Sequence, residues 1–168
     1  RDVRGQLREL LAERILVLDG SWGVLIHRRE LSEEEYRGER FRDHSHDVRG
    51  DPDILNITQP QLIAEIHDSY FAAGADIATT NTFTATSIGQ ADYDLSEHAA
   101  EMSLEGARLA RAAADAWTER TPDKPRFVAG SVGPLNVTLS LSPKVEDAAY
   151  RAVTFDRVAL EKALPYAA

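Results

Sequence analysis

Apolar positions along the chain alternate between helical spacing and short continuous runs, and this alternation predicts an α/β protein. Leucine and valine recur at helical spacing among charged residues over residues 2–14, which predicts an amphipathic helix. The continuous apolar run 15–18 predicts a strand buried on both faces, as in a parallel sheet. The glycines of the turn that follows permit close approach of a ligand or another backbone, and the turn reads Asp19-Gly20-Ser21-Trp22-Gly23.

A segment dense in charge separates this strand from the next unit. Ser32 followed by Glu35 has the spacing of a capping box and predicts a short helix, and a long loop fills the rest of residues 31–53. The loop brings His44 and His46 close together in the sequence. Metal-binding histidines need further ligands and supporting hydrogen bonds, so the charged surroundings favour a solvated loop over a metal site.

A second unit of helix and strand follows this loop. Thr58 is expected to cap the helix, because a glutamine lies three residues further on and Pro60 falls in the first turn. Gly74 ends the helix, and the short strand 76–80 comes next. His67 falls on this helix and is expected to be a surface residue.

A third unit repeats the plan. Residues 96–118 are rich in alanine and predict a helix, and the strand 126–130 follows two prolines that break the chain. The loop of this strand covers 131–136. A last helix is expected over 154–163, with Pro165 near its end.

Strands that alternate with long helices predict right-handed crossovers and a parallel sheet. Each predicted strand ends in a loop that carries Gly, Asn or Asp, and α/β proteins place their sites at those ends. Three such units are visible. A closed eight-stranded barrel needs at least roughly 200 residues, so this chain is not expected to close one alone.

Charge and composition narrow the function classes. The sequence has 19 Lys and Arg against 28 Asp and Glu, a net charge of −9, which disfavours binding to nucleic acid or to an anionic membrane surface. It contains no cysteine, which excludes disulfides and cysteine-ligated metal within these 168 residues. No apolar run approaches the roughly 18 residues that span a bilayer, and a cytoplasmic location is expected.

The residues alone make the turn after the first strand the first candidate site. A carboxylate at Asp19 beside the backbone N–H of Gly20 can hold an ammonium group or another polar substrate group. The alternative is that Asp19 only fixes the turn. No Ser/His/Asp arrangement stands out by spacing, so motif reasoning ends at an α/β protein with a polar site at its strand ends.

Taken together, several segments resemble a known family, the homocysteine-binding, zinc-dependent methyltransferase barrels. The nearest likeness is to the N-terminal homocysteine-binding domain of cobalamin-dependent methionine synthase. The segments stand in the family's order and spacing, and they include Ile15-Leu-Val-Leu-Asp-Gly20, Tyr36-Arg-Gly-Glu-Arg-Phe41, Asp53-Ile-Leu-Asn-Ile-Thr-Gln-Pro60, Ala73-Gly-Ala-Asp-Ile77, Thr80-Asn-Thr-Phe83, Arg126-Phe-Val-Ala-Gly130 and Val153-Thr-Phe-Asp156.

The resemblance implies a partial (β/α)8 TIM-type barrel, about half a barrel, with residues 1–168 as a single domain. It implies that a homocysteine-like amino acid or thiol binds at the carboxyl-terminal mouth of the strands. The family's zinc is held by three cysteines of later strands, so neither zinc nor cobalamin has binding residues here, and thiol methylation is not expected of the isolated chain. The implied substrate-binding residues are Asp19, Gly20, Ser21, Trp22, Thr80, Asn81, Ser131 and Gly133.

Departures from the family pattern concentrate at predicted strand ends that face the mouth. They suggest a changed ligand or a more apolar pocket, and they stand at Ser21, Trp22, Val24, Thr79, Leu135 and Val137. Three hypotheses follow: a methyltransferase chain whose zinc-bearing half is elsewhere, a diverged half-barrel that self-associates around another small molecule, and a non-catalytic remnant. An open sheet leaves edges and an apolar face exposed, so a homo-oligomer or a complementary half-barrel partner is expected.

Overall fold

A small parallel sheet lies at the centre of an α/β fold in the computed structural model, which describes residues 2–163. Strands β1 (Ile77–Thr79) and β2 (Phe127–Ala129) pair in parallel, with Ala78 opposite Val128. On the other edge of β1, Leu18 forms a single parallel bridge to Ile77. The first predicted strand is therefore reduced to one bridge, and the sheet order is residue 18, β1, β2.

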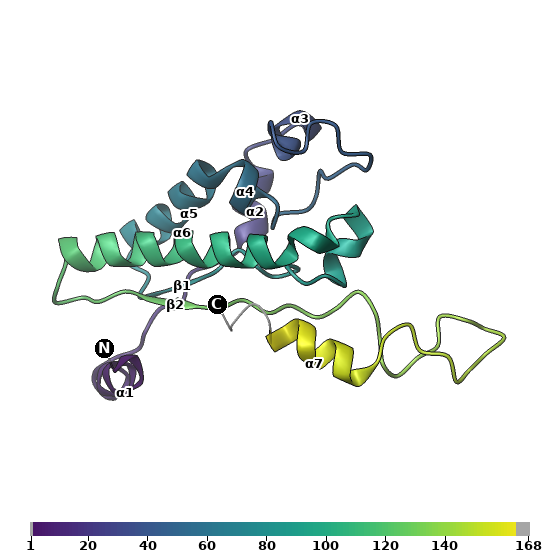
Figure 1. Cartoon of the computed structure of the whole chain (residues 1–168). Helices are drawn as coiled ribbons and strands as arrows, with labels where there is room; N and C mark the ends of the chain where they lie inside the picture. The colour runs from purple at the N-terminus through teal and green to yellow at the C-terminus, as the bar shows by residue number, and fades with distance from the viewer. Residues whose placement is uncertain (1, 164–168) are drawn as a thin grey trace.

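Two long helices cover one face of this sheet (Figure 1). They are α5 (Pro60–Ala72) and α6 (Ala99–Arg120), which also pack against each other. In Figure 1, α1 (Val3–Glu13) and α7 (Phe155–Ala163) lie on the other side of the sheet. The short elements are α2 (Trp22–His27), α3 (Glu33–Arg37), α4 (Leu55–Thr58), η1 (Gly89–Tyr93) and η2 (Ser96–His98). Among residues 2–163, no helix combines the length and the apolar character needed to cross a membrane.

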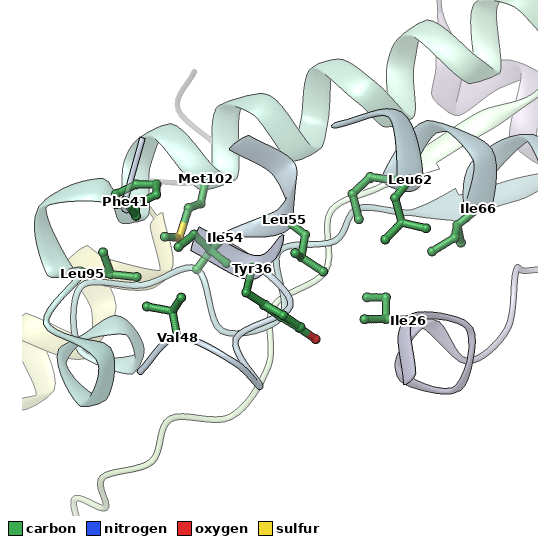
Figure 2. Close-up of a cluster of buried hydrophobic side chains, with 12 residues drawn as sticks. Ile26, Tyr36, Phe41, Val48, Ile54, Leu55, Leu62, Ile66, Leu95 and Met102 are labelled. Atoms are coloured by element: carbon green, nitrogen blue, oxygen red, sulfur yellow. The ribbon is translucent and has the colours of Figure 1, made fainter. Parts of the chain in front are cut away.

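The main hydrophobic core lies between α5, α6 and the short helices (Figure 2). Its side chains come from segments far apart in the sequence, which is why the long loop before α4 is ordered against the helices. The buried members are Ile26, Tyr36, Phe41, Val48, Ile54, Leu55, Leu62, Ile63, Ile66, Ala85, Leu95 and Met102. A second, smaller cluster packs α5 and α6 onto the sheet, and it consists of Phe71, Ala75, Ala78 and Ala114.

Several predicted elements are confirmed with small shifts of their ends. The helix expected over 2–14 is α1, and the one expected over 96–118 is η2 followed by α6. The last helix is α7, and Pro165 lies outside the described residues. Both bonds of the capping box are present: Glu35 N–H donates to the Ser32 hydroxyl at 3.3 Å, and Ser32 N–H donates to the Glu35 carboxylate at 2.7 Å.

The prediction that residues 15–18 form a strand buried on both faces is wrong. Ile15 is 85% exposed, and Val17 and Leu18 are each 53% exposed. The segment lies at the edge of the sheet, and α1, which precedes it, buries none of its own residues. No described element therefore covers this part of the sheet. We call Ile15, Val17 and Leu18 the open strip.

Two local predictions also need correction. Thr58 does not cap α5; it ends α4, where its hydroxyl donates to the carbonyl of Ile54 at 3.3 Å, and Gln59 is the residue before α5. Pro60 does begin the helix, as predicted. The segment expected to continue as a turn after Asp19 becomes helical at Trp22, because α2 begins there.

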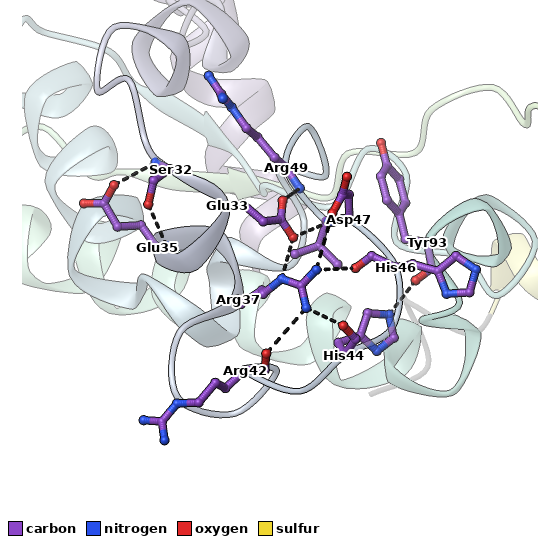
Figure 3. Close-up of polar contacts among 11 residues, drawn as sticks. Ser32, Glu33, Glu35, Arg37, Arg42, His44, His46, Asp47, Arg49 and Tyr93 are labelled. Atoms are coloured by element: carbon purple, nitrogen blue, oxygen red, sulfur yellow. Dashed lines mark hydrogen bonds and ion pairs between the residues drawn. The ribbon is translucent and has the colours of Figure 1, made fainter.

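Arg37 organises the charged loop that follows α3 (Figure 3). Its guanidinium donates to the carbonyl oxygens of His44 and His46, the second at 3.0 Å, and to the Glu33 carboxylate at 2.6 Å. The Nε2–H of His44 donates to the carbonyl of Tyr93 at 2.8 Å. The loop thus folds around one partly buried cation, and both histidines contribute backbone acceptors to it.

Candidate functional site at the strand ends

The strand ends place the first predicted site residue beside β1. The backbone N–H of Asp19 donates to the carbonyl of Ile77 at 2.9 Å, which fixes Asp19 at the carboxyl end of the sheet edge. Its side chain turns toward the next strand rather than into solvent. Oδ2 of Asp19 accepts from the N–H of Thr79 at 2.9 Å, and Oδ1 accepts from the Thr79 hydroxyl at 3.0 Å. The aspartate therefore bridges two neighbouring strand ends.

Trp22 provides a third donor to the same carboxylate. Its indole Nε1–H donates to Oδ2 of Asp19 at 3.2 Å. The Trp22 indole also contacts the ring of His67 in an edge-on arrangement, with ring centroids 4.6 Å apart and ring planes at 71°. Asp19, Trp22 and His67 thus form one chain of contacts from the strand end into α5.

The expectation that His67 lies on the surface is wrong. The side chain is fully buried, and neither ring nitrogen has a hydrogen-bond partner among the described residues. Burial lowers the pKa of His67 to about 4, because the imidazolium would lose its hydration without gaining a partner. The ring is therefore neutral at physiological pH.

The backbone of the turn rests on α5. The hydroxyl of Tyr70 donates to the carbonyl of Ser21 at 3.0 Å. A Cβ atom at Gly20 would lie 3.1 Å from that hydroxyl, so the glycine permits the close approach that its sequence position suggested. Desolvation and the charge of Asp19 both raise the pKa of Tyr70, which keeps it a hydrogen-bond donor.

A second group of contacts locks the loops after β1 and β2 together. The N–H of Ser131 donates to the Thr80 hydroxyl oxygen at 2.9 Å, and the Thr82 hydroxyl donates to the Ser131 carbonyl at 2.9 Å. The hydroxyl oxygens of Thr80 and Thr82 lie 2.6 Å apart. Because the Thr82 hydrogen is committed to Ser131, Thr80 is the donor of that bond. Thr80 and Ser131 thus tie two predicted site loops to each other.

Asn81 points into the protein rather than along the strand ends. Its Nδ2 donates to the carbonyl of Pro52 at 2.7 Å and to Oδ1 of Asn56 at 3.2 Å. Asn56 in turn donates to the carbonyls of Asn81 and Met102, at 2.7 and 3.0 Å. This buried amide pair joins the loop after β1 to α4 and α6, which is a supporting role for the site.

Gly133 lies where the loop after β2 crosses the loop after β1. Its N–H donates to the carbonyl of Phe83 at 2.9 Å, and a Cβ atom at this position would lie 2.4 Å from that oxygen. The position therefore requires glycine. Val24, one of the departures from the family pattern, is 49% exposed on α2, and Leu135 and Val137 are half-buried.

The structure thus brings Asp19, Gly20, Ser21 and Trp22 together with Thr79, and it ties Thr80 to Ser131. Sequence reasoning missed three supporting residues, Tyr70, His67 and Asn56, as parts of this region. Their hydrogen bonds and ring contact join segments distant in the sequence, so no spacing signal reveals them.

The donor set of this region does not fit zinc. The sequence has no cysteine, and within residues 2–163 no group of three or more His, Cys, Asp or Glu side chains is placed to hold a metal ion. The oxygen atoms of Asp19 and the hydroxyls around it suit a polar or cationic organic group.

Comparisons with known proteins place this arrangement in context. A family model described as homocysteine S-methyltransferase matches residues 16–161. The chain is similar to the homocysteine methyltransferase MmuM from Escherichia coli in its metallated form, with 28% identity, a TM-score of 0.59 and coverage of 76% of this chain and 41% of that chain. The oxidized form gives 30% identity, a TM-score of 0.59 and coverage of 76% and 40%. The chain spans about two fifths of the length of these structures.

Proposed function

This chain belongs to the homocysteine S-methyltransferase family, and from that premise we propose that it binds the amino-acid end of homocysteine or a related small thiol at its strand ends. In this proposal Asp19 accepts a hydrogen bond from the ammonium group. The Asp19 carboxylate, which accepts hydrogen bonds from the N–H and the hydroxyl of Thr79, is the observation that carries the proposal. It stands at the carboxyl end of the sheet, where α/β folds hold their ligands.

The chain's own residues bind and orient the substrate but do not activate its sulfur. Zinc or another Lewis acid lowers the pKa of a bound thiol and so generates the thiolate nucleophile of a methyl transfer. Because the sequence has no cysteine and residues 2–163 group no ligands for a metal ion, methyl transfer requires zinc ligands that the described residues do not provide. The isolated chain is therefore a binding unit of a methyltransferase, without methylation activity of its own.

Calorimetric titration with L-homocysteine tests this function. Asp19→Asn keeps one acceptor oxygen and the size of the side chain but removes the charge, and we expect the dissociation constant to rise at least about tenfold, the loss of one charge-assisted hydrogen bond. Asp115→Asn is the matched control, because Asp115 pairs with Arg111 on the exposed side of α6. Equal binding by the Asp19 variant and the parent chain, or no binding by the parent chain, contradicts the proposal.

We further propose that the chain forms about half of a (β/α)8 barrel and that a complementary half-barrel covers the open strip. The strip supports this, because three large apolar side chains lie more than half exposed beside an unpaired sheet edge. The matched structures are more than twice as long as the part that this chain covers, which supports a barrel completed by further strands.

Without its complement, the chain is expected to self-associate through the open strip. Light scattering should give a mass above that of a monomer, and Leu18→Lys should shift the population toward monomer. Val145→Lys is the control, because Val145 is fully exposed and lies outside the strip. A monodisperse parent monomer contradicts the proposed interface.

A further inference from the structure

We infer that His67 is a positioning residue: its buried ring holds the Trp22 indole in the orientation in which Nε1–H donates to Asp19. This inference rests on the proposed function, since it concerns the carboxylate that would receive the substrate. Trp22 is the residue through which His67 acts, and neither ring needs to contact the reacting sulfur.

The hydrogen bonds at Asp19 show what this positioning achieves. Oδ2 receives the N–H of Thr79 at 2.9 Å and the indole N–H of Trp22 at 3.2 Å, which fills its two acceptor directions. The Thr79 hydroxyl donates mainly to Oδ1, at 3.0 Å, and also lies 3.2 Å from Oδ2. Among the contacts of residues 2–163, this leaves Oδ1 with one acceptor direction for a ligand. The site therefore suits a substrate that presents a single ammonium group to Asp19.

The rings of Trp22 and His67 are in direct contact. The edge-on arrangement, with centroids 4.6 Å apart, is a favourable geometry for aromatic pairs. Trp22 is the first residue of α2, and its neighbours Ser21 and Gly23 are exposed, so the turn itself offers little packing to hold the indole. The indole is partly buried against the main hydrophobic core, and the buried ring of His67 is the aromatic surface that it contacts edge-on.

The state of the imidazole fits this role. Both ring nitrogens are buried without a hydrogen-bond partner among the described residues, a costly arrangement for a polar side chain. Because burial keeps the ring neutral, it places no cation near Asp19 that would compete with the ammonium of the substrate.

Nitrogen-15 NMR of the full chain reads the positioning directly, since the sequence has two tryptophans, Trp22 and Trp117, and therefore two indole N–H signals. In His67→Ala we expect the Trp22 signal to move and its exchange with water to accelerate about tenfold, while the Trp117 signal stays. The dissociation constant for L-homocysteine should rise about tenfold, as pre-organisation of the carboxylate is lost. His67→Phe, which keeps a ring, should restore both measurements.

Trp22→Phe approaches the same contact from the other side and keeps the test decisive if His67→Ala fails to fold. It retains the ring against His67 but removes the donor to Asp19, so homocysteine binding should weaken to the same extent. Trp117→Phe is the control and should leave binding unchanged. An unaltered Trp22 signal in His67→Ala, or parental binding by Trp22→Phe, overturns the inference.

The two proposals fail separately. If the parent chain does not bind homocysteine, the proposed function fails, and the Trp22 indole signal still decides whether His67 positions the indole. If the parent chain binds but the Trp22 signal and the affinity do not respond to His67→Ala, the proposed function stands and the positioning role is refuted.

Discussion

Arg14 and Asp76 form a bidentate ion pair that holds residues 14–17 against the start of β1. Nη1 and Nη2 of Arg14 donate to the two carboxylate oxygens at 2.9 and 2.8 Å, and the N–H of Val17 donates to the same carboxylate at 2.9 Å. The carboxylate is almost fully buried, whereas the Arg14 side chain is 38% exposed. One acidic residue thus anchors a segment that is otherwise open to solvent.

Asp76→Asn should destabilise the fold in a pH-dependent way. Burial alone would raise the pKa of Asp76, but the hydrogen bonds from Arg14 and Val17 and the charge of Lys124 hold it at about 2. A pKa below the unfolded value adds stability that is present above about pH 4 and is lost as the pH falls through 2. We expect the variant to lose about 1–2 kcal/mol at neutral pH, after a discount for the exposed Arg14.

Urea unfolding at pH 7 and at pH 2–3 measures this difference, which should shrink at the lower pH. Asp115→Asn, which breaks an exposed pair with Arg111, should change the free energy of unfolding by less than about 0.5 kcal/mol at either pH. A loss for Asp76→Asn that is the same at both pH values would show that the charge of Asp76 is not its source.

Asp51→Asn should have the opposite dependence on pH. Asp51 is fully buried, its Oδ2 and the Oε1 of Gln90 have no hydrogen-bond partner among the described residues, and burial raises the pKa of Asp51 to about 6. The adjacent Asp53 is buried too, and burial followed by the charge of Asp51 raises its pKa. A raised pKa means that the folded state binds the proton more tightly, so stability is highest below about pH 4 and falls as the pH rises through 6.

An asparagine side chain cannot ionise, so the variant escapes this loss. Its amide also brings an N–H donor close to the Oε1 of Gln90, which has no hydrogen-bond partner among the described residues. We expect the free energy of unfolding of Asp51→Asn, relative to the parent, to improve by about 2 kcal/mol between pH 4 and pH 8. Urea unfolding at both pH values checks this, and a difference that does not change with pH contradicts it.

The parts of the fold that were predicted correctly are those set by neighbours in the sequence. The capping box of Ser32 and Glu35 depends on two side chains three residues apart, and both of its bonds are present. Thr58 shows the limit of such signals. Its spacing suits a cap, but Thr58 is the last residue of a single helical turn, α4. Its hydroxyl donates to the carbonyl of Ile54 instead of capping α5.

Burial was harder to predict than secondary structure. The apolar run 15–18 indicates a strand with a layer on each face, yet a sequence does not show whether those layers are present within the chain. The prediction for His67 is wrong for a related reason. A histidine on a helix is expected to be a polar surface residue, and His67 is buried by tertiary contacts with Trp22 and the core. At the candidate site, the sequence predicts Asp19 at the carboxyl end of the first strand, which is where it lies. Its hydrogen-bond partner Thr79 is evident only from the pairing of the strands.

Gly106 lets α6 approach the loop after β1, and its replacement should show how tightly the two are packed. A Cβ atom there would lie 2.8 Å from both Nδ2 of Asn56 and Cγ2 of Thr82. Asn56 cannot retreat easily, because that nitrogen donates to two backbone carbonyls. Overpacking of this kind costs about 1–3 kcal/mol, against a gain of at most about 1 kcal/mol from better helix propensity, so Gly106→Ala should be destabilising by about 1–2 kcal/mol.

Gly23→Ala is the matched control, because Gly23 lies in α2 and a Cβ atom there meets nothing within 4 Å. The same substitution should therefore raise stability by up to about 1 kcal/mol through helix propensity alone. Urea unfolding of both variants at pH 7 separates the two effects. If Gly106→Ala were as stable as Gly23→Ala, α6 would pack only loosely against Asn56. The hydrogen bonds between Asn56 and Asn81 would then not depend on close packing at Gly106.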